Sequence, residues 1–193
     1  MAALIGLALS ATCGFRVFVP LLAVCIATRA EKAEGETYVQ LAENFSWLVS
    51  DPAFVVFLVA AIVEIVGYYL PIIDNFLDTL ATPAAMVAGT LITAAFLVDM
   101  EPWLQWVLGV VAGGGTAGAV QATTVVARAA STVTTGGLGN PVVATVETGY
   151  SFLGSLLAVV IAPLALAVSL LLVFTGVFIW IRRRRRAATE TRR

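Results

Sequence analysis

Apolar runs recur along almost the whole chain, and they decide what this chain can fold into. Of its 193 residues, 60% are hydrophobic and only 12% are charged, whereas a soluble domain is about 45–50% apolar and about 25% charged. A soluble protein of this length has room to bury one or two such runs, but not all of them. The sequence therefore predicts an integral membrane protein of the all-α class, whose helices satisfy their own backbone hydrogen bonds within lipid.

These runs predict a polytopic protein with five to six spans and interrupted helices. The four shorter runs cover residues 2–28, 52–70, 83–98 and 102–132. The last tract, residues 141–181, would reach about 60 Å as one helix, which is twice the thickness of a hydrocarbon core of about 30 Å. If this tract turns back at Pro163, the chain has six spans. No polar turn surrounds Pro163, so five spans with one broken helix is the alternative.

Basic residues gather near the end of the chain, in Arg182–Arg186. Because cytoplasmic flanks of membrane spans are rich in Lys and Arg, we expect a cytoplasmic C-terminus. The chain then divides into one transmembrane domain, 1–181, and a basic tail, 182–193. The net charge is only −1, and neither aromatic residues nor a folded nucleic-acid-binding motif accompany the arginines. We therefore expect the lipid bilayer as partner and no nucleic acid.

The chain contains no histidine, which excludes His-based zinc, haem and catalytic-triad chemistry. The only cysteines, Cys13 and Cys25, would lie about 18 Å apart on one helix, too far for a disulfide. We therefore expect no metal and no cofactor. No nucleophile–base motif is present either, so an enzyme is not expected, although an intramembrane site built from Asp and Glu remains open.

Three carboxyl groups, those of Glu64, Asp74 and Asp78, interrupt the apolar stretch 60–89. Removing each from water costs several kcal/mol unless it is paired, protonated or hydrated. Glu64 falls within the second span, where it either faces a cavity or forms a structural ion pair with Arg16. Asp74 and Asp78 share one face of a helix and, with Asn75, form an oxygen-rich patch suited to protons or a hard cation. The alternatives for that segment are a solvated loop and a short helix or re-entrant segment lining an aqueous pocket.

Further polar residues interrupt the other apolar runs. Arg16 is flanked by a glycine and a proline, and an arginine at that depth needs a carboxylate or free carbonyl groups. Arg128 either joins such a site or extends its head to the membrane surface. Asn140 belongs to the segment "TTGGLGNP", residues 134–141. This composition favours a turn before a helix that begins with proline, and the less favoured alternative is a loop whose backbone amides bind an anion. Glu147 follows in the next apolar tract.

The two halves of the chain, 1–98 and 102–181, share a weak pattern. Residues 62–69 read "IVEIVGYY" and residues 145–150 read "TVETGY", so a glutamate precedes glycine and tyrosine in each. If each half holds three spans, the two halves have opposite orientations in the membrane, as in the inverted repeats of many secondary transporters. Chance similarity between short apolar segments is the alternative.

Four glycines, Gly109, Gly113, Gly114 and Gly118, form pairs spaced four residues apart in the fourth run. Such a spacing gives a face on which another helix can approach closely. We therefore expect a homo-oligomer through this face.

Four motifs occur in order: "SATCGFRVFVPLLAV", "PIIDNFLDTLATPAAMVAGT", "AGGGTAGAVQ", and "GGLGNPVV" followed by Glu147. Over roughly residues 4–168 the chain resembles the domain of unknown function 4126 family, small polytopic bacterial membrane proteins without an assigned activity. The resemblance implies a bacterial cytoplasmic (inner) membrane, and it marks these positions as characteristic: Arg16, Pro20, Glu64, Asp74, Asp78, Pro83, Arg128, Asn140, Pro141 and Glu147. The chain departs from the pattern by lacking an Asp-Lys pair at 67–69, an arginine at Thr82 and a histidine near Gln121.

The leading functional hypothesis is a transport or permeation protein. Its site would combine the polar residues Arg16, Glu64, Asp74, Asn75, Asp78, Arg128, Asn140 and Glu147, and it would bind protons, a cation, or a lipid-like or small polar substrate. The alternative is a non-catalytic membrane scaffold or assembly factor in which the same charges are structural pairs. The transport hypothesis requires these side chains, distant in sequence, to meet in a hydrated chamber between the helices.

Overall fold

The computed structural model describes residues 2–34 and 39–160, apart from the side chains of Glu34, Pro71, Ile72 and Asn75, and every regular element within that part of the chain is a helix. The elements are α1 Ala2–Cys13, α2 Phe18–Glu34, the 3-10 helix η1 Glu43–Val49, α3 Asp51–Gly67, α4 Pro71–Ala95, α5 Pro102–Leu108, the π-helical η2 Gly109–Gly114, α6 Gly115–Thr135 and a final helix Asn140–Val160. The all-α class is confirmed.

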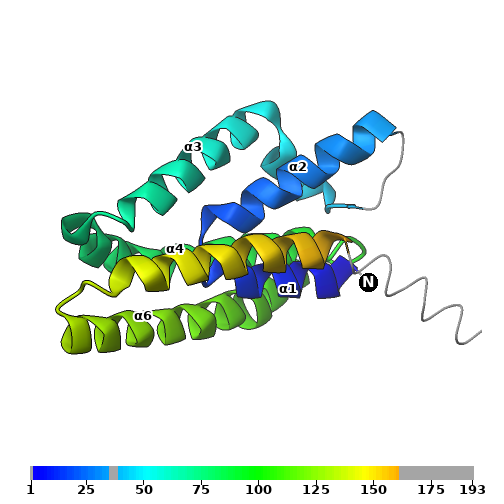
Figure 1. Ribbon diagram of the computed structural model, residues 1–193. Coiled ribbons are helices and arrows are strands. Elements are labelled where there is room, and N and C mark those ends of the chain that lie inside the picture. The colour runs from blue at the N-terminus through cyan, green and yellow to red at the C-terminus, as the bar shows by residue number, and fades with distance from the viewer. Residues whose placement is uncertain (1, 35–38, 161–193) are drawn as a thin grey trace, which may run out of the picture.

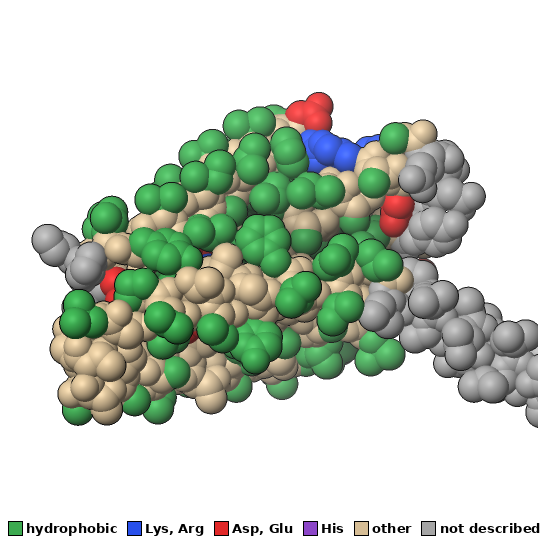
Figure 2. Space-filling model, in the orientation of Figure 1, with side chains coloured by type: hydrophobic (Ala, Val, Ile, Leu, Met, Phe, Trp, Pro, Cys, Tyr) green, Lys and Arg blue, Asp and Glu red, His purple; other side chains and the backbone are tan. Residues whose placement is uncertain are grey.

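In the described part of the chain, three helices are long and apolar enough to cross a membrane: Phe76–Ala95, Pro102–Thr135 and Asn140–Val160. A fourth span results if η1 and α3, which meet at a bend of 55°, are counted together. Hydrophobic side chains cover most of the face shown in Figure 2, as expected where lipid is the solvent. The architecture is that of a helical membrane protein, while five to six spans stays a prediction because Pro163 and the arginine cluster lie outside the described residues.

The first apolar run, 2–28, is two helices and not the single span that we expected. The chain leaves α1 at Cys13 and begins α2 at Phe18, and Figure 1 shows it reversing direction there, part-way along the bundle. Pro20 favours the break, because its ring would clash with the carbonyl group of Arg16 in a regular continuous helix. Gly14 permits the tight packing of the turn, since a Cβ atom there would lie only 2.6 Å from the carbonyl oxygen of Ala117. At twelve residues, α1 is ~18 Å long.

The helix of the third predicted span begins at Pro71 and not at Pro83, because α4 is one continuous helix of 25 residues, within which Phe76–Ala95 is the candidate span. Pro71 occupies the first turn, where its missing N–H costs nothing, and Pro83 lies within the helix. The segment with Asp74 and Asp78 is therefore neither a solvated loop nor a separate re-entrant helix. Both acidic residues lie in the first turns of α4.

The glycine face of η2 and α6 packs against α4 of the same chain, and association between copies through this face stays a prediction. A Cβ atom at Gly109 would lie 2.8 Å from the carbonyl oxygen of Thr90, and one at Gly114 would lie 2.7 Å from the hydroxyl oxygen of Thr90. Gly113 meets the backbone of Gly89, and Gly118 meets Met86. The glycine spacing does allow a close helix–helix approach, and the helix that approaches is α4 of the same chain.

Candidate functional site

Arg128 of α6 lies at the centre of a buried group of charges, with its side chain only 3% exposed. Its Nη1 donates to Asp74 Oδ1, its Nη2 donates to Glu147 Oε2, and its Nε donates to Glu147 Oε1 at 3.2 Å. Its Nε also lies 3.6 Å from Asp78 Oδ1. Arg128 is therefore held by carboxylates from α4 and from the final helix, and it does not extend to the membrane surface.

Arg16, in the turn between α1 and α2, is the second cation of the site and its side chain is 1% exposed. Its Nη1 lies 3.1 Å from Glu147 Oε2, so Glu147 bridges both arginines. Its Nε donates to Thr148 Oγ1 at 3.0 Å and its Nη2 donates to the carbonyl oxygen of Ala144 at 2.8 Å. We call Arg16, Asp74, Asp78, Arg128 and Glu147 the charge cluster.

Tyr68 lies against both arginines, and the sequence analysis did not identify it as a site residue. The guanidinium carbon of Arg16 lies 4.1 Å from the centre of the Tyr68 ring, and that of Arg128 lies 4.0 Å from it. The face of an aromatic ring attracts a cation, so the ring adds a favourable contact to both charges. Its sequence signal is its place in the glutamate, glycine and tyrosine pattern that the two halves of the chain share.

Glu64 does not form the ion pair with Arg16 that we considered. Its Oε1 accepts the backbone N–H of Val17 at 2.8 Å, and its Oε2 accepts that of Phe18 at 3.1 Å. These amide groups stand at the start of α2, where helical N–H groups have no partner in the helix and the dipole attracts negative charge. Glu64 therefore caps the N-terminal end of α2, directly after the turn that carries Arg16.

Asn140 begins the final helix and extends the charge cluster towards the end of the bundle. Its Nδ2 donates to Asp74 Oδ2 at 2.9 Å and to Thr132 Oγ1 at 3.1 Å. The preceding residues form the turn that the sequence predicts, with Gly136 and Gly137 at φ values of 65° and 89°. The side chain of Asn75, the last of the expected site residues, lies outside the described part of the structure.

Acidic groups outnumber basic ones at this site. The charge cluster holds three carboxylates and two guanidinium groups, which leaves a formal charge of −1 when all are ionised, and Glu64 beside Arg16 brings the formal charge to −2. Asp78 is the least satisfied of the acids, because its buried Oδ1 accepts no hydrogen bond. Within the described residues, no three His, Cys, Asp or Glu side chains converge as a metal ion would require.

Three cavities each reach one of the acids Asp74, Glu147 and Glu64. One of about 180 Å³, beside the 136–138 turn, is lined by Tyr68, Asp74 and Asn140. A second, of about 400 Å³ between α6 and the final helix, includes Glu147. A third, of about 310 Å³ between α3 and α4, includes Glu64 and Tyr68. Tyr68 therefore lines both the first and the third cavity.

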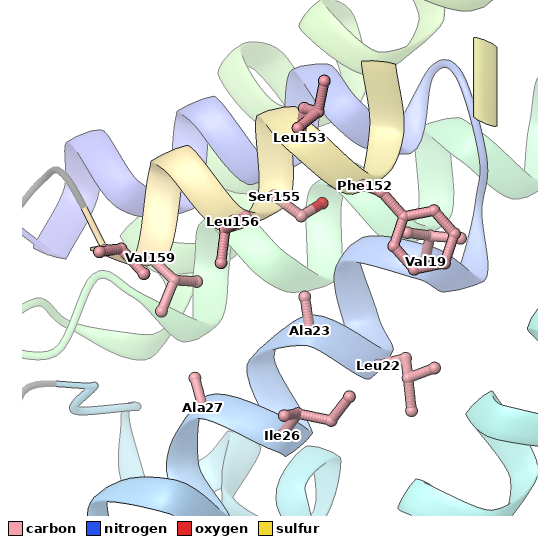
Figure 3. Close-up of a pocket in the computed structure, with 11 residues that line it drawn as sticks. Val19, Leu22, Ala23, Ile26, Ala27, Phe152, Leu153, Ser155, Leu156 and Val159 are labelled. Carbon is pink, nitrogen blue, oxygen red and sulfur yellow. The ribbon is translucent and has the colours of Figure 1, made fainter. Parts of the chain in front are cut away.

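A fourth cavity, of about 360 Å³, lies apart from the charges between α2 and the final helix. Figure 3 shows its aliphatic side chains, among them Ala23 and Ile26 from α2 and Leu156 from the final helix. The hydroxyl group of Ser155 is its one side-chain polar group, and that group lies 3.2 Å from Thr12 Oγ1. This cavity has no charged group with which to bind an ion.

Most of the polar residues that the sequence analysis named as site residues lie in contact with one another in the structure. Arg16, Asp74, Asp78, Arg128, Asn140 and Glu147 converge from four parts of the chain, and Glu64 lies against the same turn through backbone amides. The sequence analysis missed Tyr68 and the hydroxyl groups of Thr132 and Thr148.

Comparison with known proteins gives a family and no activity. No curated protein and no solved structure matches the chain. One family model does, over residues 3–183, which is nearly the whole sequence and includes every residue of the charge cluster. The chain therefore belongs to the family described as "Domain of unknown function (DUF4126)", and its resemblance to that family is confirmed.

Proposed function

We propose that this protein is a membrane transport protein in which protons bind and leave at the charge cluster. The observation that carries the proposal is the excess of buried carboxylates over arginines, three against two, with Glu64 as a fourth acid beside them. An unpaired charge in a medium of low dielectric constant is costly. The site is therefore most stable when it takes up positive charge.

A proton suits this site better than a metal ion. The described acids do not converge as a metal ion's ligands would, and Asp74 and Glu147 are already held by arginine. Asp78 differs from them, because its ion pair with Arg128 is long, at 3.6 Å, and its side chain is 16% exposed. We assign the exchangeable proton to Asp78, with Asp74 and Asn140 forming the polar route from the cavity at the 136–138 turn.

The test is Asp78→Asn, which keeps the shape of the side chain and removes its ability to exchange a proton. In liposomes containing the purified protein, an inside-negative potassium diffusion potential should drive protons inward, as reported by an internal pH-sensitive dye. We expect the wild type to exceed protein-free liposomes and Asp78→Asn to fall to their level. Its Tm should stay within a few degrees of wild type, because Asp78 accepts no hydrogen bond at Oδ1.

The matched control is Asp51→Asn, the same chemical change at an exposed residue paired with Arg29. Its proton uptake should equal that of the wild type. Wild-type uptake no faster than that of empty liposomes would overturn the proposal, as would full activity in Asp78→Asn.

A membrane scaffold is the second candidate, and the bonding of Arg16 favours it. All three nitrogens of that side chain donate to fixed groups, including two backbone carbonyl oxygens, those of Phe15 and Ala144. Such a residue ties the α1–α2 turn to the final helix whether or not anything moves. A scaffold predicts no proton uptake by the wild type, together with loss of stability in every charge-cluster variant.

A further inference from the structure

We infer that the cavity between α3 and α4 binds an amphiphilic organic cation that arrives from the lipid bilayer. This inference rests on the proposed function and names the substrate class of the same site. The cation would place its apolar groups among the aliphatic side chains of the cavity and its charge beside Glu64.

The cavity has the size and the lining for such a molecule. Its volume is about 310 Å³, at the lower end of the range of about 300–1,000 Å³ for small-molecule sites. Apart from Glu64 and Tyr68, its lining is aliphatic or aromatic: Val17, Phe18, Ala60, Val63, Leu77, Leu80, Ala81 and Ala84. Val63 and Leu80 are 62% and 49% exposed, so the cavity opens on the apolar outer surface of the protein, where a lipid-soluble molecule arrives.

The polar end of the cavity selects for a cation. Each oxygen of Glu64 accepts one backbone N–H, and an ionised carboxylate has about four acceptor sites, so acceptor capacity remains. No arginine forms an ion pair with Glu64 among the described residues, whereas Glu147 in the cavity beside α6 is bound by two. With the formal charge of −2 at this end of the cavity, positive charge is favoured there and negative charge is repelled.

The position of Tyr68 links this cavity to the proton route. It lines the α3–α4 cavity and also the cavity that holds Asp74 and Asn140. A cation bound beside Glu64 would therefore lie close to the charge cluster, with Tyr68 lining both cavities. Binding of that cation and binding of a proton would satisfy the same excess of negative charge, so each should weaken the other.

Tetraphenylphosphonium and tetraphenylborate provide the test, since they share one shape and carry opposite charges. Binding of each radiolabelled ion is measured to the purified protein in lipid nanodiscs, with binding to empty nanodiscs subtracted. We expect saturable binding of tetraphenylphosphonium and none of tetraphenylborate. Glu64→Gln should weaken binding of the cation at least about ten-fold, because charge attraction in a poorly hydrated site exceeds that in water.

A pair of cavity-filling variants tests the location without changing charge. Ala84→Phe fills the α3–α4 cavity and should weaken cation binding at least about ten-fold, whereas Ala23→Phe fills the uncharged cavity of Figure 3 and should leave it unchanged. Equal binding of both ions, no saturable binding to the wild type, or full binding by Ala84→Phe would overturn the inference. Proton uptake is measured without either ion, so intact uptake with no cation binding refutes this inference alone. Cation binding without proton uptake refutes the proposed function and keeps the site.

Discussion

Arg128→Met is expected to lower the stability of the folded protein by about 3–5 kcal/mol, the usual cost of removing one partner from a buried ion pair. The substitution leaves Asp74, Asp78 and Glu147 in the interior without the cation that they share. At about 2–4 °C per kcal/mol for a chain of this size, the Tm measured in detergent should fall by about 6–20 °C. Much of the protein should also elute as aggregate in size-exclusion chromatography.

Arg29→Met is the matched control, because Arg29 is half-buried and pairs at 2.7 Å with Asp51, which is 97% exposed. Exposed pairs contribute about 0.2–1 kcal/mol, so its Tm should fall by no more than a few degrees. A compensated variant tests the cause directly. Adding Asp74→Asn and Asp78→Asn to Arg128→Met removes two of the three stranded charges and leaves Glu147 paired with Arg16, so it should recover a large part of the lost Tm. If Arg128→Met melts like Arg29→Met, the charge cluster does not stabilise the fold.

The sequence was informative wherever a single segment determines the outcome. The apolar runs required helices in lipid, and the spacing of Asp74 and Asp78 required a shared helix face, which the structure turns towards Arg128. The cost of burying a charge required partners for Arg16, whereas for Arg128 a shared site and the membrane surface stayed as alternatives. These arguments depend on local spacing or on a general energy, so they need no knowledge of the tertiary arrangement.

The choice of partner is different, because it depends on contacts between distant segments. Arg128 pairs with Asp74 across 54 positions, and Arg16 with Glu147 across 131. Nothing in the spacing distinguishes Arg16–Glu147 from the pair Arg16–Glu64 that we considered. The actual partners of Glu64 are backbone amides. Because every residue except proline has such an amide, the sequence does not indicate which of them Glu64 binds.

Proline was a good guide to helix starts at Pro52, Pro71 and Pro102, and it misled at Pro83. The sequence predicts the start of a span at Pro83, but this residue lies inside α4. Membrane helices tolerate proline where neighbouring groups satisfy the freed backbone. Pro20, in contrast, follows a real break, because the turn before it is anchored by Arg16 and by the amides bound to Glu64. The difference lies in the packing around each proline and not in the sequence next to it.

Gly113→Ala is expected to destabilise the protein by about 1–3 kcal/mol or more, the usual cost of overfilling a packed interior. The added Cβ atom would overlap the carbonyl oxygen of Gly89 and the hydroxyl oxygen of Thr93. Both belong to α4, and the carbonyl oxygen is backbone that cannot move without shifting the helix. The carbonyl oxygen of Gly113 also accepts a hydrogen bond from Ser10 Oγ at 2.5 Å, so a shift of η2 disturbs the contact with α1 as well.

Gly115→Ala, two residues further along, adds the same methyl group where no atom lies within 4 Å. Alanine is favoured over glycine within a helix by about 0.8–1.0 kcal/mol, so this variant should melt slightly above the wild type while Gly113→Ala melts several degrees below it. Thermal unfolding of the two proteins in the same detergent measures the difference. Equal Tm values would mean that the glycine face does not need its close approach to α4. Opposite shifts would show that Gly113 is needed for the close packing of η2 against α4.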